Sequence, residues 1–510
     1  MLFWTAQMLG STFEKERLRY REIIESAPFD LGYITAQPKM LADNLAMYKG
    51  LVADSLLRRI PELKPEKYLQ KGYSEDIARD LARVELDMPE GREKGLNALA
   101  DNLNPMDSDA VLSRLPTRTA LIDIAKCDGI DEAGFNKGKY VAIVYNKEGI
   151  LPIQMIELGD AVKIEALVAE FLALVESSTT DDRLSEVSQK LYASLVDPWL
   201  VHVSSNNSEI VICPDGALSF VNFSALPDAN GKFLGEKIPV SFIGSARDLF
   251  PVKPLRIQRN NESKLEVRVF ADPDYKAPLS AQIFSLFGAR RNTVLNPLPE
   301  TRKEAFAIIN AFDQSNKAVR IFTGMEATEE NVRNSQGTLV LHLGTHGFFN
   351  HLAVENPMRA NGLAFAGAFK NFKPGLAVEY PDNPHDGILT AEEISKMDLG
   401  GCALVSVSAC QSGMGKSSDG EGVLGIRRGF IQAGASNLLL CLWPIGDREA
   451  GVFVDHFYGL IGKDVPLNEA YHLTVASLIR KAADEKGISY AIRAVGPFVM
   501  NSVYKKITEN

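Results

Sequence analysis

Cysteine is scarce in this sequence. Among 510 residues there are five, namely Cys127, Cys213, Cys402, Cys410 and Cys441. Their number is odd and no two are spaced as CxxC, which argues against a disulfide framework and against a zinc site built from thiolates. Because so few cysteines are typical of a reducing compartment, we expect a cytoplasmic protein.

The sequence also lacks a long apolar run and an excess of basic residues. No segment approaches the ~18 consecutive apolar residues of a membrane span, and the opening MLFWTAQMLG has neither a basic segment before it nor a cleavage pattern after it. The net charge of −10 argues against a nucleic-acid-binding surface, which usually carries a basic patch. We therefore expect no direct contact with a membrane or with nucleic acid.

Helix-forming residues dominate the first part of the chain. Leu, Ala, Glu, Lys and Arg are frequent in residues 1–115, and stretches such as EKERLRYREIIES and SEDIARDLARVEL have helical spacing. We predict a helical N-terminal region there. No repeat near 34 residues is evident, so an array of tetratricopeptide repeats is not supported.

Two α/β segments follow the helical region. In residues 116–260 the β-branched runs TALIDIAKC, KYVAIVYN and EIVIC surround one strongly helical pattern. In residues 261–510 short apolar runs alternate with helical patterns, which predicts a mostly parallel sheet flanked by helices on both faces. Because sites in such sheets lie beyond the carboxyl ends of the strands, we expect the functional residues there.

Two of the expected strands end in side chains that could react. LVLHLGTHG ends in His346 and Gly347, and ALVSVSAC ends in Cys410. If these strands are neighbours, an imidazole and a thiol meet at one edge of the sheet. An adjacent imidazolium lowers the pKa of a thiol from about 8.5 by several units, and the imidazole can then protonate a leaving amine. The N–H groups of Gly347 and Cys410 could receive the oxyanion of an attacked peptide carbonyl.

The remaining cysteines and histidines have simpler explanations. A single cysteine on an apolar strand is most often a small buried hydrophobic residue, and this interpretation also applies to Cys410 taken alone. Cys402 lies about 26 Å from Cys410, at ~3.3 Å per strand residue, so only Cys410 is at the carboxyl end. We interpret Cys213 and Cys441 as core residues, and His342, inside its strand, as a buried or supporting residue.

Several motifs occur in an order that resembles one known family. HLGTHG, DGILTAEEI, ALVSVSACQSGMG and GEGVLGIRRGFIQAGASNLLLCLWPIGD follow one another, and ICPDGALSFVNFSALPD and FADPDY extend the resemblance to residues 116–485. They resemble the CHAT family, caspase-like proteases that are often attached to tetratricopeptide repeats and are similar to separases. Two departures stand out: Ser412 replaces the usual Thr, and the long repeat array is absent.

The resemblance carries expectations about fold and chemistry. It implies a caspase-type sheet in residues 261–510, an inactive caspase-like half in residues 116–260, and cysteine endopeptidase activity with a His346 and Cys410 dyad. It implies no metal and no organic cofactor. By family analogy the substrate is a protein in a bacterial defence or cell-death pathway, such as a gasdermin-like pore former or a CRISPR-associated protein. An activating partner would then bind the helical N-terminal region.

Acidic residues near the expected site are candidates for substrate binding. Asp447 and Glu449 follow a strand in a place similar to where separases hold an acidic residue for a basic P1 side chain, and Asp419, Glu421 and Asp386 lie in nearby loops. An Asp after a strand is equally often the N-cap of a helix, so this alternative stays open for Asp447.

Two other classes of function compete with a protease. CQSGMGKS approaches a phosphate-binding loop, but Cys410 stands where the first glycine is required, and GEGVLG lies too far from its strand for a dinucleotide fingerprint. A catalytically silent scaffold with the same fold is the other alternative. An inactive copy usually lacks one member of the dyad, and both are present here.

Overall fold

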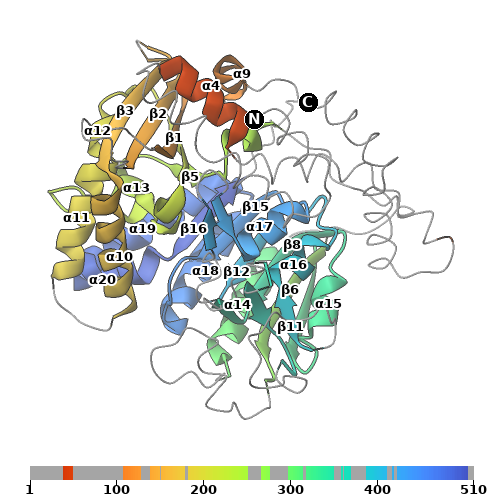
Figure 1. The fold of residues 1–510 in the computed structure, drawn as a ribbon. Helices are drawn as coiled ribbons and strands as arrows, with labels where there is room; N and C mark the ends of the chain where they lie inside the picture. The colour runs from red at the N-terminus through yellow and green to blue at the C-terminus, as the bar shows by residue number, and fades with distance from the viewer. Residues whose placement is uncertain are drawn as a thin grey trace.

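The computed structural model describes most of the chain from residue 107 onward and a short part before it (Figure 1). The described residues are 38–49, 70, 107–127, 138–149, 151–177, 182–250, 266–275, 297–313, 317–349, 358–359, 361–368, 386–409, 416–418 and 422–502. Among them, no helix is both long enough and apolar enough to cross a membrane.

One 11-stranded sheet runs through the described molecule. From edge to edge the strands are β3 (Ile153–Asp160), β2 (Lys139–Asn146), β1 (Thr119–Cys127), β4 (Glu209–Cys213), β5 (Val240–Phe242), β16 (Phe498–Ser502), β15 (Asn437–Cys441), β12 (Leu404–Ser408), β8 (Thr338–Gly344), β6 (Glu266–Pro273) and β7 (Ala318–Gly324). Most neighbours are parallel; the antiparallel pairs are β2 with β3, β1 with β2, and β15 with β16. The alternating and β-branched runs of the sequence form these strands, as expected.

The sheet is continuous across the two expected α/β segments. The C-terminal strand β16 lies between them, because Asn501 pairs with Phe242 of β5 on one side and β15 flanks it on the other. We call the part of the sheet formed by the first segment the first half and the part formed by the second segment the second half. Since β16 is parallel to β5 but antiparallel to β15, the parallel strands of the two halves run in opposite directions. The boundaries 1–115, 116–260 and 261–510 therefore stay predictions about the chain, while the sheet itself is a single unit.

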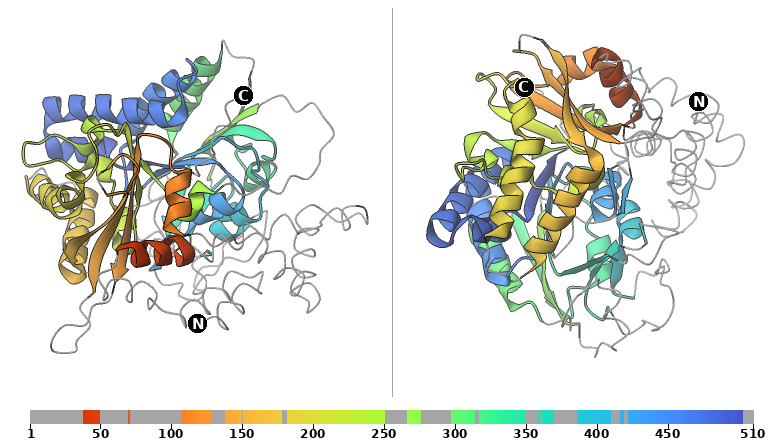
Figure 2. Two further views of the ribbon diagram at one scale, coloured as in Figure 1. Left: turned by 90° about the horizontal axis from the view of Figure 1, so that it is seen from above. Right: turned by 60° about the vertical axis from the view of Figure 1, so that its left-hand side comes forward.

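Helices cover both faces of the sheet (Figure 2). On one face lie α10 (Ala161–Glu176), α11 (Arg183–Leu195), α14 (Pro299–Phe312), α18 (Asp447–Ile461), α19 (Leu467–Lys486) and α20 (Ile488–Val495), and on the other α4 (Pro38–Tyr48), α9 (Ser108–Arg114), α16 (Ala391–Ser395) and α17 (Ile426–Gln432). Shorter elements complete the connections: α12 (Asp197–Leu200), α13 (Leu234–Lys237), α15 (Glu329–Arg333), η2 (Gly216–Phe220), η3 (Phe223–Ala225) and η4 (Ala246–Leu249). The predicted fold class is confirmed: a mixed α/β protein with a large, mostly parallel sheet flanked by helices.

Helix α10 shows how the sequence produces this layering. The Asp160 side chain caps the helix by accepting a hydrogen bond from the Lys163 N–H. Ile164, Val168 and Phe171 recur at helical spacing and are buried, so one face of α10 packs on the sheet. The ring of Phe171 meets Trp443, just after β15, edge to face at 5.4 Å.

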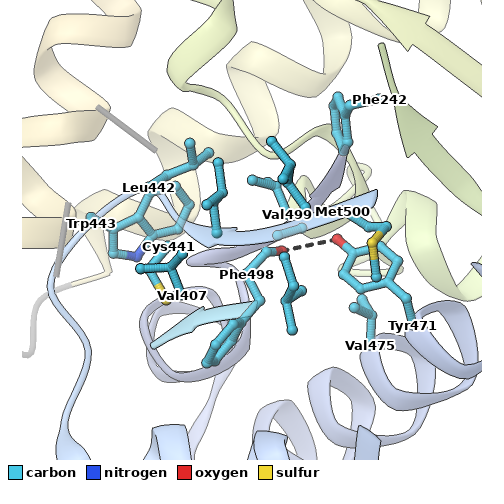
Figure 3. Packing of buried hydrophobic residues seen from close by; sticks show 14 of the residues in the cluster. Phe242, Val407, Cys441, Leu442, Trp443, Tyr471, Val475, Phe498, Val499 and Met500 are labelled. Carbon is cyan, nitrogen blue, oxygen red and sulfur yellow. Dashed lines mark hydrogen bonds between the residues drawn. The ribbon is translucent and has the colours of Figure 1, made fainter. Parts of the chain in front are cut away.

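The largest cluster of buried hydrophobic residues includes β15 and β16, the strands that join the two halves (Figure 3). Phe498 of β16 stacks on Phe453 of α18 with ring centroids 3.8 Å apart. The Tyr471 hydroxyl donates to the Phe498 carbonyl at 2.9 Å, so the buried hydroxyl of α19 has a partner. These contacts hold the central strands against α18 and α19.

Of the predicted helical N-terminal region, the structure describes α4, α9 and a few neighbouring residues. The stretches EKERLRYREIIES and SEDIARDLARVEL lie outside the described residues. Leu41 and Leu45 of α4 are buried in one cluster with residues of β1, β2 and β4, which makes α4 part of the first half of the molecule. Directly after α4, the buried Lys49 ammonium donates to the Asp123 carboxylate at 2.7 Å and to the Cys213 carbonyl at 3.0 Å.

Candidate active site

The two strands that lead to the candidate dyad are neighbours. β8 and β12 are parallel, and their last paired residues are Gly344 and Ser408. His346 comes two residues after Gly344, and Cys410 comes two residues after Ser408. Because paired parallel strands end at the same edge of the sheet, the chain leaves both strands side by side toward these two residues. Cys410 itself lies outside the described residues, so its pairing with His346 stays a prediction.

His346 is the first residue of a second, smaller sheet. β9 (His346–Phe349) pairs with β10 (Asn361–Ala364), which pairs with β11 (Ile388–Thr390). The sequence predicted a single strand ending at His346, but the main strand ends at Gly344 and the chain bends at Thr345. His346 is half-buried at this bend, so its side chain packs against its neighbours and is also partly accessible to solvent.

A tyrosine fixes the backbone of His346. The rings of Tyr275 and His346 lie 5.2 Å apart between centroids, and the buried Tyr275 hydroxyl is 2.8 Å from the Thr345 hydroxyl. The His346 N–H also donates to the Tyr275 oxygen, and Thr345 donates to the Ala364 carbonyl. Hydrogen bonds thus run from His346 through Tyr275 and Thr345 to β10. Burial raises the pKa of Tyr275, so its hydroxyl keeps its proton.

Sequence reasoning did not single out Tyr275, although a signal for it exists. FADPDY contains the end of β6, and Tyr275 follows the last residue of β6, Pro273, by two positions. β6 is the other neighbour of β8. Tyr275, His346 and Cys410 therefore each come two residues after one of three adjacent strands.

Two short strands that follow Cys410 in the sequence contact the first half of the molecule. β13 (Lys416–Ser418) and β14 (Gly422–Leu424) are antiparallel, and both contact η2. Lys416 and Ser417 lie in a strand, so the phosphate-loop alternative lacks the helix that it requires. Asp419 and Glu421 lie outside the described residues, and their substrate role stays a prediction.

The described acidic candidates occupy different environments. Asp386 is buried, and its carboxylate accepts a hydrogen bond from the Ile388 N–H at 2.7 Å. Asp447 is exposed in the first turn of α18, whose N-cap is Gly446, so the interpretation of Asp447 as an N-cap is wrong. Glu449 is half-buried and accepts a hydrogen bond from the Tyr490 hydroxyl at 2.9 Å. Substrate binding by these three residues stays a prediction.

Four of the five cysteines are buried and form no disulfide bond: Cys127, Cys213, Cys402 and Cys441. Cys402 lies before β12, at the amino end, where its thiol donates to the Leu404 carbonyl at 3.3 Å. The prediction that Cys402 lies at the amino end of its strand, opposite to the end that leads to Cys410, is confirmed. Burial also raises the pKa of the Cys213 thiol well above its ordinary value, although Lys49 opposes the shift.

These features define an α/β protein with a candidate site at the carboxyl edge of a mostly parallel sheet. The family model described as the CHAT domain matches residues 185–490, which is more than half of the chain. The chain belongs to the CHAT-domain family.

The relatives found by sequence are much longer than this chain. Tetratricopeptide repeat protein 28 of Mus musculus is 25% identical over 297 residues, covering 52% of this chain and 11% of the relative. The protein of the same name from Homo sapiens is 23% identical over 296 residues, with the same coverage. The chain therefore matches about a tenth of the length of these relatives.

Solved structures of the Saccharomyces cerevisiae separase–securin complex are similar to this chain. The structure at 3.0 Å gives a TM-score of 0.47 at 9% identity, covering 91% of this chain and 34% of that chain. The structure at 2.6 Å gives a TM-score of 0.44 at 9% identity, covering 90% and 36%.

Proposed function

We propose that this chain is a cysteine endopeptidase in which His346 and Cys410 form the catalytic dyad. The observation that carries the proposal is the pairing of Gly344 with Ser408, which ends two adjacent parallel strands at the same level. Membership of the CHAT-domain family supports it. The alternative with the same fold is a silent scaffold, which would bind a partner and cleave nothing.

The proposed reaction is acyl transfer through the thiol. The Cys410 thiolate attacks the peptide carbonyl carbon, and the carbonyl electron pair moves to oxygen, where the N–H groups of Gly347 and Cys410 stabilise it. Collapse of this intermediate breaks the C–N bond, and the His346 imidazolium gives its proton to the leaving amine. Water, deprotonated by His346, then releases the acid and restores the thiolate.

Thiol activation can be measured without knowing the substrate. Because the four described cysteines are buried, iodoacetamide should alkylate Cys410 selectively in the native protein, and mass spectrometry can follow the peptide that contains it. In wild type the rate should stay high well below pH 8.5, since the imidazolium stabilises the thiolate. In His346→Ala it should fall about tenfold per pH unit below pH 8.5. Equal profiles for the two proteins would contradict the dyad.

The substrate and setting that we propose follow the family resemblance. We propose a cytoplasmic protease that cuts a protein partner in a bacterial defence or cell-death pathway, such as a gasdermin-like or CRISPR-associated protein. We propose that the protease prefers a basic P1 side chain, and the position of Asp447, which is exposed and follows β15, supports this preference. An activating partner would bind the N-terminal helical region. Cleavage that is lost in Asp447→Asn, for sites with Arg or Lys at P1, would support the P1 assignment, and unchanged cleavage would reject it.

A further inference from the structure

A buried polar cluster lies below the strand ends, on the face of the sheet covered by α14 and α18. Its members come from four elements, and none is more than 8% exposed: Glu304 of α14, His342 of β8, Ser406 and Ser408 of β12, and Tyr458 of α18. In β8 and β12, His342 pairs with Ser406 and Gly344 with Ser408, so the cluster spans the last rungs of this ladder.

Glu304 connects the two strands with one carboxylate. Its Oε2 lies 3.0 Å from Nε2 of His342, and its Oε1 accepts a hydrogen bond from the Ser408 hydroxyl at 3.0 Å. With the proton of His342 on Nε2, Nδ1 is left to accept from the hydroxyl of Ser406 at 3.2 Å or of Tyr458 at 3.3 Å. Both oxygens of the carboxylate and both nitrogens of the ring therefore have partners.

The approach of α14 to this place is specific to the strand end. A Cβ on Gly344 would lie 2.9 Å from the Cβ of Thr301 in α14, so the absence of a side chain allows the helix to pack directly on the end of β8. Thr301 in turn accepts a hydrogen bond from the Asp272 N–H, in β6. The first turns of α14 thus contact the ends of β6, β8 and β12 together.

Stability alone does not account for this cluster. Removing a carboxylate and an imidazole from water costs several kcal/mol, and apolar side chains of the same volume are often as stable or more so. A polar cluster does fix geometry, because each hydrogen bond specifies both a distance and a direction. In the sequence, Ser408 lies two residues before Cys410 and His342 lies four residues before His346. These positions indicate that the fixed geometry serves the candidate dyad.

We propose that Glu304 is a positioning residue for the protease site. One carboxylate holds β8 through His342 and β12 through Ser408, and so sets the separation and level at which the chain departs toward His346 and Cys410. We call this double link from Glu304 to His342 and Ser408 the clamp. This role rests on the proposed function. Because misplacement by about 1 Å can reduce a rate about 100-fold, a loss of the link should be visible in the reaction of the thiol with an electrophile.

The test uses the full chain and the pH profile of Cys410 alkylation by iodoacetamide. Ser408→Ala removes the link to β12, and Glu304→Ala removes both links. Glu304→Gln is the conservative variant, because its amide oxygen can accept from Ser408 and its amide N–H can donate to His342 in the other tautomer. Tyr471→Phe is the matched control, since it removes a buried hydroxyl hydrogen bond from α19 that touches neither β8 nor β12.

If the clamp exists, Cys410 in Ser408→Ala and Glu304→Ala is alkylated at least about tenfold more slowly than in wild type at pH 6, at a rate that approaches that of His346→Ala. Glu304→Gln and Tyr471→Phe keep the wild-type profile. If Glu304→Ala does not fold, Ser408→Ala decides. Wild-type profiles in both alanine variants, with only His346→Ala changed, would overturn the clamp and leave the dyad standing, and so would a Glu304→Gln profile as poor as that of Glu304→Ala. An unchanged profile in His346→Ala would reject the dyad and the clamp with it.

Discussion

Tyr275 lies against His346, with 5.2 Å between ring centroids, and its hydroxyl links the His346 N–H to Thr345. This contact joins the end of β6 to the bend where β8 turns into β9. The imidazole is therefore held from the side of β6 by a residue that is itself buried. The tyrosine hydroxyl therefore helps to set the backbone position of His346.

Tyr275→Phe should reduce thiol reactivity while leaving the fold intact. The ring stays, but the His346 N–H loses its acceptor and Thr345 loses a donor, at a cost of about 1–3 kcal/mol in stability. We expect Cys410 alkylation at pH 6 to slow roughly tenfold, because the imidazole is less well placed. Tyr145→Phe is the control, since its hydroxyl donates to the Ala42 carbonyl in the first half. Equal alkylation rates in the two variants would contradict a role for Tyr275.

A buried acidic cluster next to the small sheet should make stability depend on pH. Burial and the charges of Glu393 and Asp386 raise the pKa of Glu329 to about 9, although Arg333 opposes the shift. Between the unfolded value of 4.5 and about 9, the folded state keeps a proton that the unfolded state has released. The contribution of this group is therefore full below pH 4.5, falls by about 1.4 kcal/mol per pH unit as pH rises, and levels off above pH 9.

Glu329→Gln tests this linkage directly. The amide mimics the protonated acid and can still accept the hydrogen bond from the Gly387 N–H, which wild type makes at 3.1 Å. We expect the variant to be more stable than wild type at pH 8, by roughly 2–4 kcal/mol, with a difference that shrinks toward pH 5. Thermal unfolding of both proteins from pH 5 to 9 measures it. A difference that does not change with pH would exclude Glu329 as the source.

The buried pair of Lys49 and Asp123 should attach α4 strongly to the first half. Burial alone would lower the pKa of Lys49, but Asp123, Cys213 and Asp215 outweigh it and raise the pKa above its ordinary value. Lys49→Met should destabilise the protein by about 3–5 kcal/mol, because it leaves the Asp123 carboxylate buried without a cation. Adding Asp123→Leu should recover most of the loss. Urea unfolding of the single and double variants checks this, and a double variant as unstable as Lys49→Met would contradict it.

The elements of the site were more predictable from sequence than its contacts. The runs LVLHL and ALVSVS predicted β8 and β12 because short, mostly apolar runs with β-branched residues are typical of buried parallel strands. Their adjacency was an expectation that the pairing of Gly344 with Ser408 confirmed. The bend at Thr345 could not be predicted, because it depends on a hydrogen bond to Ala364, 19 residues later.

The remaining features depend on contacts between distant parts of the chain. In the sequence, Glu304 has the pattern of an ordinary helix residue. Its role depends on a hydrogen bond from Ser408 of β12, 104 residues later in the chain. Likewise, nothing in the run FVMNS shows that β16 pairs with β5 of the other half. Local patterns predict which segments are strands and helices, whereas one sequence does not reveal which of them meet.

The central claim is that the chain cuts proteins with Cys410 and His346, and new protein termini test it most directly. Wild type and variants would each be mixed with a lysate and with neighbouring gene products, and the resulting N-termini identified by mass spectrometry. We predict new termini with wild type and with the buried Cys402→Ala variant, and none with Cys410→Ala or His346→Ala. The same new termini from the Cys410→Ala or His346→Ala protein, or their loss in a well-folded Cys402→Ala protein, would contradict the account.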